Sequence, residues 1–402
     1  MAFSYDALIV GSGPAGCAAA FDLARNGKRV LLLDKRLFPR PKACACGLTR
    51  KTLAALRYSV DPVVERVCDE IVLQRATSGT VADKSQEIRV KAKTPIAAMA
   101  VREKFDAYCL EQTLKAGAKG GSAEWMKIDN ILTLDEQPDH VALTVATNDG
   151  PQTFTAPVLI GADGSNGQTR RLSTQSKLLT GEEPQWYMRG FALEAMVPYT
   201  SLPVPLPEGD GPQDLVFDFA PLADGYGWLF PKGDHINIGV GAFAPDNDPI
   251  NAKLKTVTRA LLAEYTRTKL GVELPAEVTG QYLGMGGHRY APRGRVLLVG
   301  DAAGLVDPLT GEGIHSALVS GQAAAAAILG APYAMAEGYA HHLRPLQEVL
   351  AFSDRASRSF YREPARGFKV MRWPLLRNLV LKTYADGVGK TKLLATLARW
   401  AS

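Results

Sequence analysis

Two short apolar runs with a helical segment between them open the chain. Ala7–Val10 and Val30–Leu33 have the length and composition of buried strands, and Cys17–Arg25 is alanine-rich and helical in character. A strand, a helix and a second strand in this order predict a βαβ unit with parallel strands. The second strand ends at Asp34, roughly 20 residues beyond the glycine loop that follows the first strand.

Later apolar runs predict further strands. Val141–Ala146 and Thr153–Ile160 alternate or run apolar as strands do, and the second leads into the turn Gly161–Gly164. Arg295–Val299 is another apolar strand, and it ends just before Asp301. Thr153–Ile160 and Arg295–Val299 therefore each deliver a glycine-rich turn or an acid at the carboxyl end of a strand.

Between Glu183 and Gly284 the pattern changes. Aromatic residues, proline and glycine become more frequent, and strand-like segments recur. These segments are Met188–Met196, Leu215–Phe219, Gly227–Phe230 and Ile236–Ala242. They predict an antiparallel sheet, inserted between the segments described above, that forms a substrate domain.

Composition excludes some classes of partner. The 402 residues are 46% hydrophobic with a formal charge of +5, as in ordinary globular proteins. No basic stripe interleaved with aromatics accompanies this charge, so nucleic acid is not an expected partner. Five cysteines without regular spacing are a poor disulfide framework and favour a reducing, cytoplasmic compartment. The first apolar run leads into a glycine loop rather than a cleavage site, and no stretch approaches the roughly 20 apolar residues of a membrane span.

The segment GSGPAG at Gly11–Gly16 has the spacing of a dinucleotide-binding turn. Gly11 permits the tight turn, Gly13 lets the backbone approach a pyrophosphate, and Gly16 lets the helix pack on the strand. The helix N-terminus offers free N–H groups and a positive dipole end to phosphate. Asp34 can accept hydrogen bonds from the adenosine ribose. This turn alone does not distinguish NAD from FAD.

The segment VGDAAGLVDPLTGEGI at Val299–Ile314 favours FAD. Asp301 follows a strand and can bind a ribityl hydroxyl, and Gly311, Gly313 and Ile314 stand where a helix should begin. A helix N-terminus beneath a flavin ring stabilises negative charge at N1 and O2 when the ring is reduced. We therefore predict bound FAD and an oxidoreductase.

Together with GADGSNGQTRR at Gly161–Arg171, these segments resemble the FAD-dependent oxidoreductase superfamily typified by para-hydroxybenzoate hydroxylase. The resemblance covers nearly the whole chain except the tail. It implies that Arg102 contacts the flavin, although a solvated helix arginine is the alternative. It also implies that Asp163, which precedes Gly164 in the DG motif, supports flavin and nicotinamide binding. Gly167 departs from the small hydroxyl residue that the superfamily usually has.

Two further segments look like signatures of the geranylgeranyl reductase family. GYGWLFPK at Gly225–Lys232 matches its Tyr-x-Trp-x-Phe-Pro pattern, and PKACACGL at Pro41–Leu48 resembles its cysteine- and glycine-containing loop. Ala45 and Cys46 stand where that loop usually has glycines. The residues that we assign to the cofactor are Gly11, Gly13, Pro14, Ala15, Gly16, Asp34, Lys35, Cys44, Ala45, Gly47, Arg102, Asp163, Gly164, Asp301, Gly311, Gly313 and Ile314.

The predicted fold class is α/β, with a Rossmann-like FAD-binding domain of the para-hydroxybenzoate hydroxylase type. An antiparallel-sheet substrate domain is inserted into it, and a basic helical C-terminal tail follows. The predicted segments are 1–75, 101–182 and 285–350 for the FAD-binding domain, 76–100 and 183–284 for the substrate domain, and 351–402 for the tail.

The resemblance implies a reductase that saturates C=C bonds of a prenyl or similarly hydrophobic substrate. An isolated double bond needs a hydride from flavin N5 on one carbon and a proton on the other. Tyr226, Trp228 and Phe230 alternate on a predicted strand and can hold the alkene between aromatic walls, although ordinary sheet-core packing is the alternative. The proton donor is Cys44 or Tyr226, and Cys44 as a small packing residue remains open. The catalytic candidates are thus Cys44, Tyr226, Trp228 and Phe230.

Two other functions remain open. One is an FAD-dependent monooxygenase that hydroxylates an aromatic or polyketide with NAD(P)H and O2, and the other is a non-catalytic flavin-binding protein. The electron donor of a reductase would be NAD(P)H or a reduced electron carrier. No metal is expected, because the chain has neither HExxH nor paired CxxC.

The tail is basic, with nine Lys or Arg against two acids between Arg362 and Ser402. It predicts either an amphipathic segment in peripheral contact with a membrane or a helical cap over the substrate domain. We expect a cytoplasmic protein in both cases. The oligomeric state is not predicted.

Overall fold

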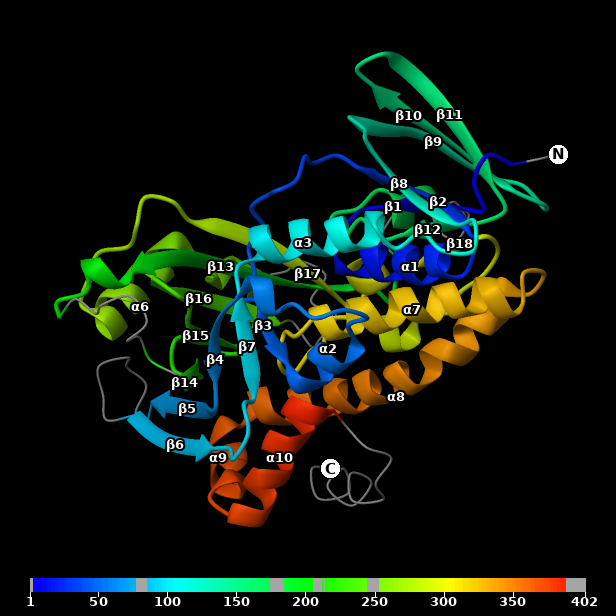
Figure 1. Cartoon of the computed structure of the whole chain (residues 1–402). Helices are drawn as coiled ribbons and strands as arrows, with labels where there is room; N and C mark the ends of the chain where they lie inside the picture. Colours follow the sequence, from blue (N-terminus) through cyan, green and yellow to red (C-terminus); the bar gives the residue numbers. More distant parts are fainter. Residues whose placement is uncertain are drawn as a thin grey trace.

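A parallel sheet and a larger mixed sheet organise the computed structural model, which describes residues 3–76, 85–173, 184–204, 212, 214–243 and 253–387 (Figure 1). The parallel sheet has five strands in the order β18-β12-β1-β2-β8. Its strands are β1 (Ala7–Val10), β2 (Arg29–Asp34), β8 (Ser122–Lys127), β12 (Leu159–Gly161) and β18 (Val296–Leu298). Because all its pairings are parallel, the carboxyl ends of β1, β12 and β18 lie side by side.

Small residues let the helices of this half pack closely. α1 (Pro14–Arg25) packs on the parallel sheet and contacts α3 (Arg102–Leu114) and α7 (Ile314–Gly330), while α8 (Met335–Arg362) packs on α7 (Figure 1). A Cβ atom on Gly321 would lie 2.2 Å from the carbonyl oxygen of Ala15. Glycine on α7 is therefore required for the close approach of α7 to α1.

The predicted strand Thr153–Ile160 is in fact two strands in two sheets. β11 (Gly150–Ala156) pairs with β10 (Val141–Thr147), which pairs with β9 (Asn130–Glu136), whereas β12 belongs to the parallel sheet. Pro157 lies between them and has no N–H to donate to a continuous ladder. The sequence prediction was wrong here because the apolar run conceals this break.

The larger sheet has seven strands in the order β17-β13-β16-β15-β14-β5-β6. Its strands are β5 (Glu70–Ala76), β6 (Ser85–Lys91), β13 (Met188–Pro198), β14 (Asp214–Asp218), β15 (Gly225–Pro231), β16 (His235–Phe243) and β17 (Thr279–Met285). The four segments predicted as an antiparallel sheet are β13 to β16, and this prediction is confirmed. One pairing differs, since β14 runs parallel to β5. β5 thus joins this sheet although we assigned it to segment 1–75, and the domain boundaries stay a prediction.

Smaller elements connect the two large sheets. β3 (Gly47–Thr49), β7 (Ala97–Ala100) and β4 (Val64–Cys68) form a three-stranded sheet in the order β3-β7-β4. α2 (Arg50–Ala55) follows β3, α4 (Thr169–Leu172) begins within the end of the segment Gly161–Arg171, and α6 (Arg259–Leu270) packs on β13 and β16.

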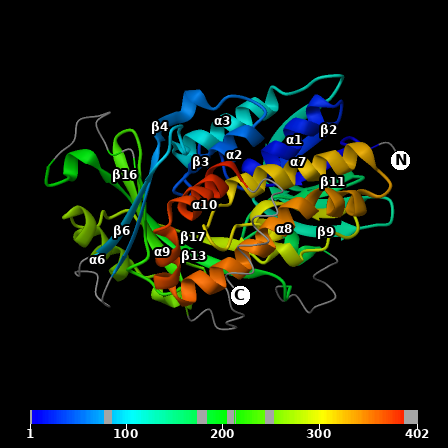
Figure 2. The ribbon, with the colours of Figure 1, turned by 90° about the horizontal axis from the view of Figure 1, so that it is seen from below.

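The tail folds back as helices. α9 (Pro364–Met371) and α10 (Pro374–Asp386) follow α8, and α10 packs against α2, β3 and β6 (Figure 2). Phe368 of α9 is 1% exposed and packs with Ile88 and Val90 of β6. The described part of the tail is thus a helical cap, and residues 388–402 lie outside the described residues. Within the described ranges, no helix has the length and apolar character needed to cross a membrane.

Candidate functional site

The three glycine-rich segments meet at the carboxyl edge of the parallel sheet. A Cβ atom on Gly11 would lie 2.3 Å from the carbonyl oxygen of Ala162, and one on Gly300 would lie 3.2 Å from Cβ of Ala15. Gly11 and Gly300 have φ of +101° and +56°, which side chains rarely allow. The edge is therefore built of backbone, as close approach of a dinucleotide requires.

The N-terminus of α1 is open to a phosphate group. α1 begins at Pro14, and its N-cap Gly13 has no side chain to occupy the free N–H groups. A Cβ on Gly13 would meet no atom closer than the Arg40 guanidinium at 3.6 Å. Free N–H groups beneath a nearby cation fit the pyrophosphate of FAD.

Asp34 holds the glycine turn against β2. Its Oδ2 accepts the N–H of Ser12 at 2.7 Å, and its Oδ1 accepts the N–H of Arg36 at 2.9 Å. A carboxylate keeps further lone pairs for ribose hydroxyls. The neighbouring Lys35 instead donates to Asn130 at 2.7 Å and Gln168 at 2.6 Å, so the protein itself occupies its ammonium group.

Asp163 is turned toward α4. It accepts the backbone N–H of Thr169 at 2.9 Å and also the Thr169 hydroxyl. A Cβ on Gly167 would lie 2.2 Å from this carboxylate, so glycine at 167 makes room for it. Burial raises the pKa of Asp163, and the bonds from Thr169 only partly offset this. Gly164 next to it has φ of +78°, and the role of both residues in flavin or nicotinamide binding stays a prediction.

The third segment brings Asp301 to the start of α7. A Cβ on the α7 N-cap, Gly313, would lie 3.4 Å from Oδ1 of Asp301, and this cap also has no capping side chain. The Glu312 carboxylate contacts the segment that contains β3 and the start of α2. It accepts the Thr49 hydroxyl at 2.8 Å and pairs with Lys51 at 2.6 Å. The N–H groups of α7 thus remain available to a flavin ring.

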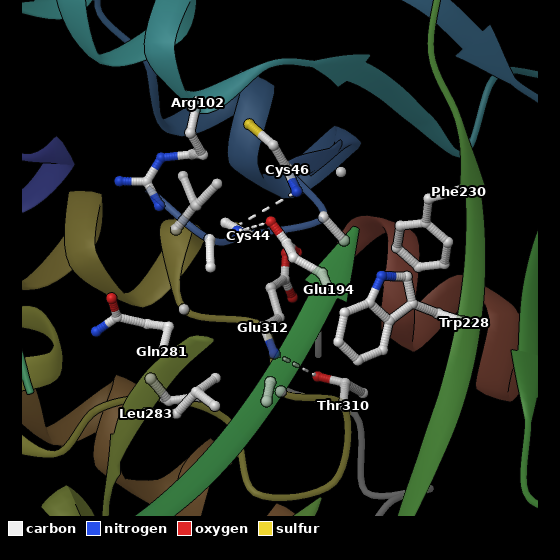
Figure 3. Close-up of a pocket in the computed structure, with 18 of the residues that line it drawn as sticks. Cys44, Cys46, Arg102, Glu194, Trp228, Phe230, Gln281, Leu283, Thr310 and Glu312 are labelled. Atoms are coloured by element: carbon white, nitrogen blue, oxygen red, sulfur yellow. Dashed lines mark hydrogen bonds between the residues drawn. The ribbon is translucent and has the colours of Figure 1, made fainter. Parts of the chain in front are cut away.

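A pocket opens where these segments face the larger sheet (Figure 3). It contains about 1070 Å³ of empty space, part of it open to solvent. The predicted site residues that line it are Pro14, Cys44, Ala45, Gly47, Arg102, Tyr226, Trp228, Phe230, Asp301, Gly311, Gly313 and Ile314. The predicted residues outside this lining are Gly11, Gly13, Ala15, Gly16, Asp34, Lys35, Asp163 and Gly164. This division fits a long cofactor whose two ends occupy different places.

Arg102 is a buried residue rather than a solvated one. It opens α3, is 5% exposed, and makes two hydrogen bonds of 2.8 Å to Asp106. Arg40 reaches the same carboxylate at 3.2 Å. Two guanidinium groups on one acid leave positive charge facing the pocket, as an electron-rich flavin would require.

The Cys44 loop is held by groups from the larger sheet. The N–H of Cys44 donates to Glu194 at 2.8 Å, and the ammonium group of Lys232 donates to the carbonyl oxygens of Ala45 at 2.5 Å and Ala100 at 2.9 Å. Cys46 has φ of +46°, and its N–H donates to the Cys44 sulfur at 3.4 Å. Both cysteines are free thiols.

The predicted aromatic residues form one wall of the pocket. Tyr226, Trp228 and Phe230 are each 6–7% exposed and lie on the same face of β15. The indole N–H of Trp228 donates to Asn237 at 2.6 Å, and the hydroxyl of Tyr226 donates to the carbonyl of Thr310. Burial raises the pKa of Tyr226. Its proton is therefore committed to a backbone carbonyl, which weakens its case as a proton donor.

Sequence reasoning missed several pocket residues. Glu194 on β13 is 2% exposed, and Tyr384 enters the lining from the tail helix α10. Lys42 also lines the pocket, and its pKa is lowered by burial and by Arg102. A lone acid inside the apolar run FALEAMV was a signal that could have identified Glu194. No local pattern indicated Tyr384.

One cluster of potential metal ligands lies outside the pocket lining. Glu65, Asp234 and His235 bring ligand atoms within 4.8 Å of one another. Lys104 pairs with Glu65 at 2.7 Å, and Asp234 is 76% exposed. The cluster carries no further argument, because exposed acids gather without a metal in many proteins.

Comparison with known proteins shows the class of enzyme to which the chain belongs. A family model described as an FAD binding domain matches residues 4–336, so the protein is an FAD-binding oxidoreductase. The chain belongs to the geranylgeranyl reductase family within the para-hydroxybenzoate hydroxylase-like superfamily of these enzymes.

Curated relatives cover most of the chain. It is 28% identical to a geranylgeranyl diphosphate reductase of Rhodobacter capsulatus, over 81% of this chain and 75% of the relative. It is 31% identical to a menaquinone reductase of Mycolicibacterium smegmatis, over 80% and 75%. It is 30% identical to a digeranylgeranylglycerophospholipid reductase of Methanopyrus kandleri, over 80% and 76%.

Solved structures show the same fold. A geranylgeranyl bacteriochlorophyll reductase-like protein of Thermoplasma acidophilum superposes with a TM-score of 0.69 at 22% identity, covering 89% of this chain and 87% of that one. A flavin-dependent brominase gives 0.74 at 16% identity, covering 99% and 98%. At these identities the likeness concerns the fold alone.

Proposed function

We propose that the protein is an FAD-dependent reductase that saturates C=C bonds of a prenyl, geranylgeranyl-type or similarly hydrophobic substrate. The observation that carries this proposal is the aromatic wall facing Asp301 and the start of α7 across one pocket. An isolated alkene offers nothing to hydrogen-bond, so burial between such walls is the way to hold it. Similarity to a geranylgeranyl diphosphate reductase and to a digeranylgeranylglycerophospholipid reductase supports the same substrate class.

The chain's own residues hold the reactants. Reduced FAD, when bound, supplies a hydride. The start of α7 at Gly313 and the cation Arg102 stabilise negative charge on the flavin side of the pocket. Tyr226, Trp228 and Phe230 hold the alkene, exclude water from it, and stabilise positive charge on the carbon that receives no proton. Cys44 remains a candidate contact with the substrate.

We also propose an electron donor and a membrane contact for the protein. The electron donor is NAD(P)H or a small reduced carrier that binds transiently. The protein is cytoplasmic, and the tip of the α9–α10 hairpin touches a membrane surface from which a lipid-like substrate is drawn. The exposed Trp373 and Leu375 at that tip, with Lys369 and Arg372 beside them, support this contact.

Anaerobic turnover tests the function. The purified protein with bound FAD is reduced with dithionite, and geranylgeranyl diphosphate or a geranylgeranylated lipid is added. We expect the oxidised flavin spectrum to return and the lipid to gain about two hydrogens in mass for each bond reduced. Flavin that stays reduced until air enters would contradict the proposal. Oxygen then appearing in an aromatic substrate would favour the monooxygenase.

A further inference from the structure

A buried acid that the predicted chemistry does not use lies in the centre of the pocket. Glu194 projects from β13 between the Cys44 loop and the aromatic wall (Figure 3). It is 2% exposed, and every neighbour on its strand from Leu193 to Val197 is apolar. Burying a carboxyl group in such a strand is costly, and hydrogen bonds offset that cost only in part, so the presence of Glu194 needs an explanation.

We propose that Glu194 is the catalytic acid that gives the alkene its proton. This inference rests on the proposed reductase function and deepens it. One alkene carbon takes a hydride from the N5–H bond of the reduced flavin, and the other carbon takes H⁺ from Glu194. The C=C π bond, the flavin N5–H bond and the carboxyl O–H bond break, and two C–H bonds form. The alkene is reduced, the flavin is oxidised, and the carboxylate recovers its proton from solvent.

The hydrogen bond that Glu194 accepts is compatible with a protonated carboxyl group that donates H⁺ to the alkene. The N–H of Cys44 donates to its Oε1 at 2.8 Å. A protonated carboxyl group accepts with one oxygen and carries its proton on the other, so this bond is compatible with a neutral acid. Burial raises the pKa of Glu194 above its ordinary value of 4.5, and the Cys44 N–H and the Asn237 side chain only partly counter this.

The other groups in the pocket are less suited to donate. The Tyr226 hydroxyl already donates a hydrogen bond to the Thr310 carbonyl. The Lys232 ammonium group donates hydrogen bonds to the carbonyls of Ala45 and Ala100. The charged or titratable groups that line the pocket or act on Glu194 are Arg102, Lys42, Lys232, Cys44, Cys46, Tyr226, Tyr384, Asp301 and Glu312. Of these, Cys44 is the rival donor that an experiment must exclude.

Glu194→Gln separates chemistry from structure. The amide oxygen can still accept the Cys44 N–H, but the amide is far too weak an acid to donate a proton. We expect anaerobic reoxidation of reduced flavin by the alkene to slow about 100-fold or more, while flavin content and flavin reduction stay as in the wild type. In the wild type, the rate of reoxidation should decline at high pH, because the catalytic acid loses its proton there. Cys44→Ala should keep this decline, and Glu194→Gln should abolish it. Glu348→Gln, at an exposed position on α8, is the matched control.

A second measurement needs neither flavin nor substrate. Because the folded pKa of Glu194 is raised, its protonated form stabilises the fold, fully so below pH 4.5, and this stability is lost as pH rises through the folded pKa. Glu194→Gln mimics the protonated form. Its free energy of unfolding in urea should match the wild type at acid pH and exceed it at neutral pH.

The possible outcomes point to different conclusions. If the wild type turns over and Glu194→Gln reoxidises its flavin equally fast, the role of Glu194 is overturned. The same holds if the decline in rate at high pH disappears in Cys44→Ala but not in Glu194→Gln. If the wild type does not reoxidise with any prenyl alkene, the proposed function fails and the role of Glu194 fails with it.

Discussion

At the scale of the residue, Cys46 shows how far a motif can depart from its family. The resemblance expects glycine at this position, and the structure gives Cys46 a left-handed backbone with φ of +46°. Such a conformation costs a side chain about 1 kcal/mol. Gly167 is the opposite case, since a side chain there would collide with Asp163. Both departures were visible in the sequence, but their causes are backbone geometry that spacing alone does not reveal.

Two substitutions separate backbone strain at Cys46 from the loss of its thiol. Cys46→Ala removes the thiol and keeps the strain, whereas Cys46→Gly removes both. We expect Cys46→Gly to be more stable than Cys46→Ala by about 1 kcal/mol in urea unfolding. Equal stability of the two variants would mean that the loop relaxes without cost.

At the scale of the element, the short loop before β3 depends on the end of β15. Lys232 is fully buried and holds the carbonyls of Ala45 and Ala100, while its own carbonyl accepts Arg66 at 2.9 Å and Tyr199 at 3.0 Å. The sequence contains this lysine in the segment Gly225–Lys232, but the two carbonyls that its ammonium group holds are more than 130 residues away. The parallel pairing of β14 with β5 was unpredictable for the same reason.

Removing the ammonium group tests this dependence. Lys232→Met fills similar volume but leaves both carbonyls without their donor, so the free energy of unfolding should fall by about 2 kcal/mol or more. Proteolysis should become faster within the Cys44 loop. Lys115→Met, at an exposed i,i+4 pair, is the control and should change stability by less than about 0.5 kcal/mol. A similarly small effect at Lys232 would show that water replaces the ammonium group freely.

At the scale of the whole molecule, the tail hairpin exposes an apolar tip. Val370, Trp373 and Leu375 are 45%, 69% and 86% exposed, and Lys369 and Arg372 lie among them. From residue 364 to 385 the chain has no acid. Aromatic and aliphatic groups beside cations complement an anionic lipid surface.

Vesicle sedimentation measures this contact. The double variant Trp373→Ser and Leu375→Ser should bind vesicles of phosphatidylcholine and phosphatidylglycerol at least about tenfold more weakly than the wild type. Tyr333→Ser, which changes an exposed aromatic residue in the α7–α8 connection, should bind like the wild type. Equal binding of vesicles by the wild type and both variants would contradict a membrane contact at this tip.

Most of the cofactor side was predictable from the sequence, and less of the substrate side was. Glycine turns follow strands at fixed spacing, so Gly11, Asp301 and Gly313 could be assigned to the cofactor by rules of local geometry, and their roles in binding stay a prediction. Glu194 and Tyr384 belong to no spacing pattern, because they meet only when the larger sheet and the tail fold against the loop.

The backbone construction of the sheet edge has an evolutionary consequence. Where backbone carbonyl and N–H groups contact a ligand and only glycine fits, a substitution cannot tune the contact. It can only disrupt the site. Under the proposed function, adaptation to a new substrate is therefore confined to the walls contributed by β13, β15, the Cys44 loop and α10. Within this fold, specificity can drift while the redox machinery stays fixed.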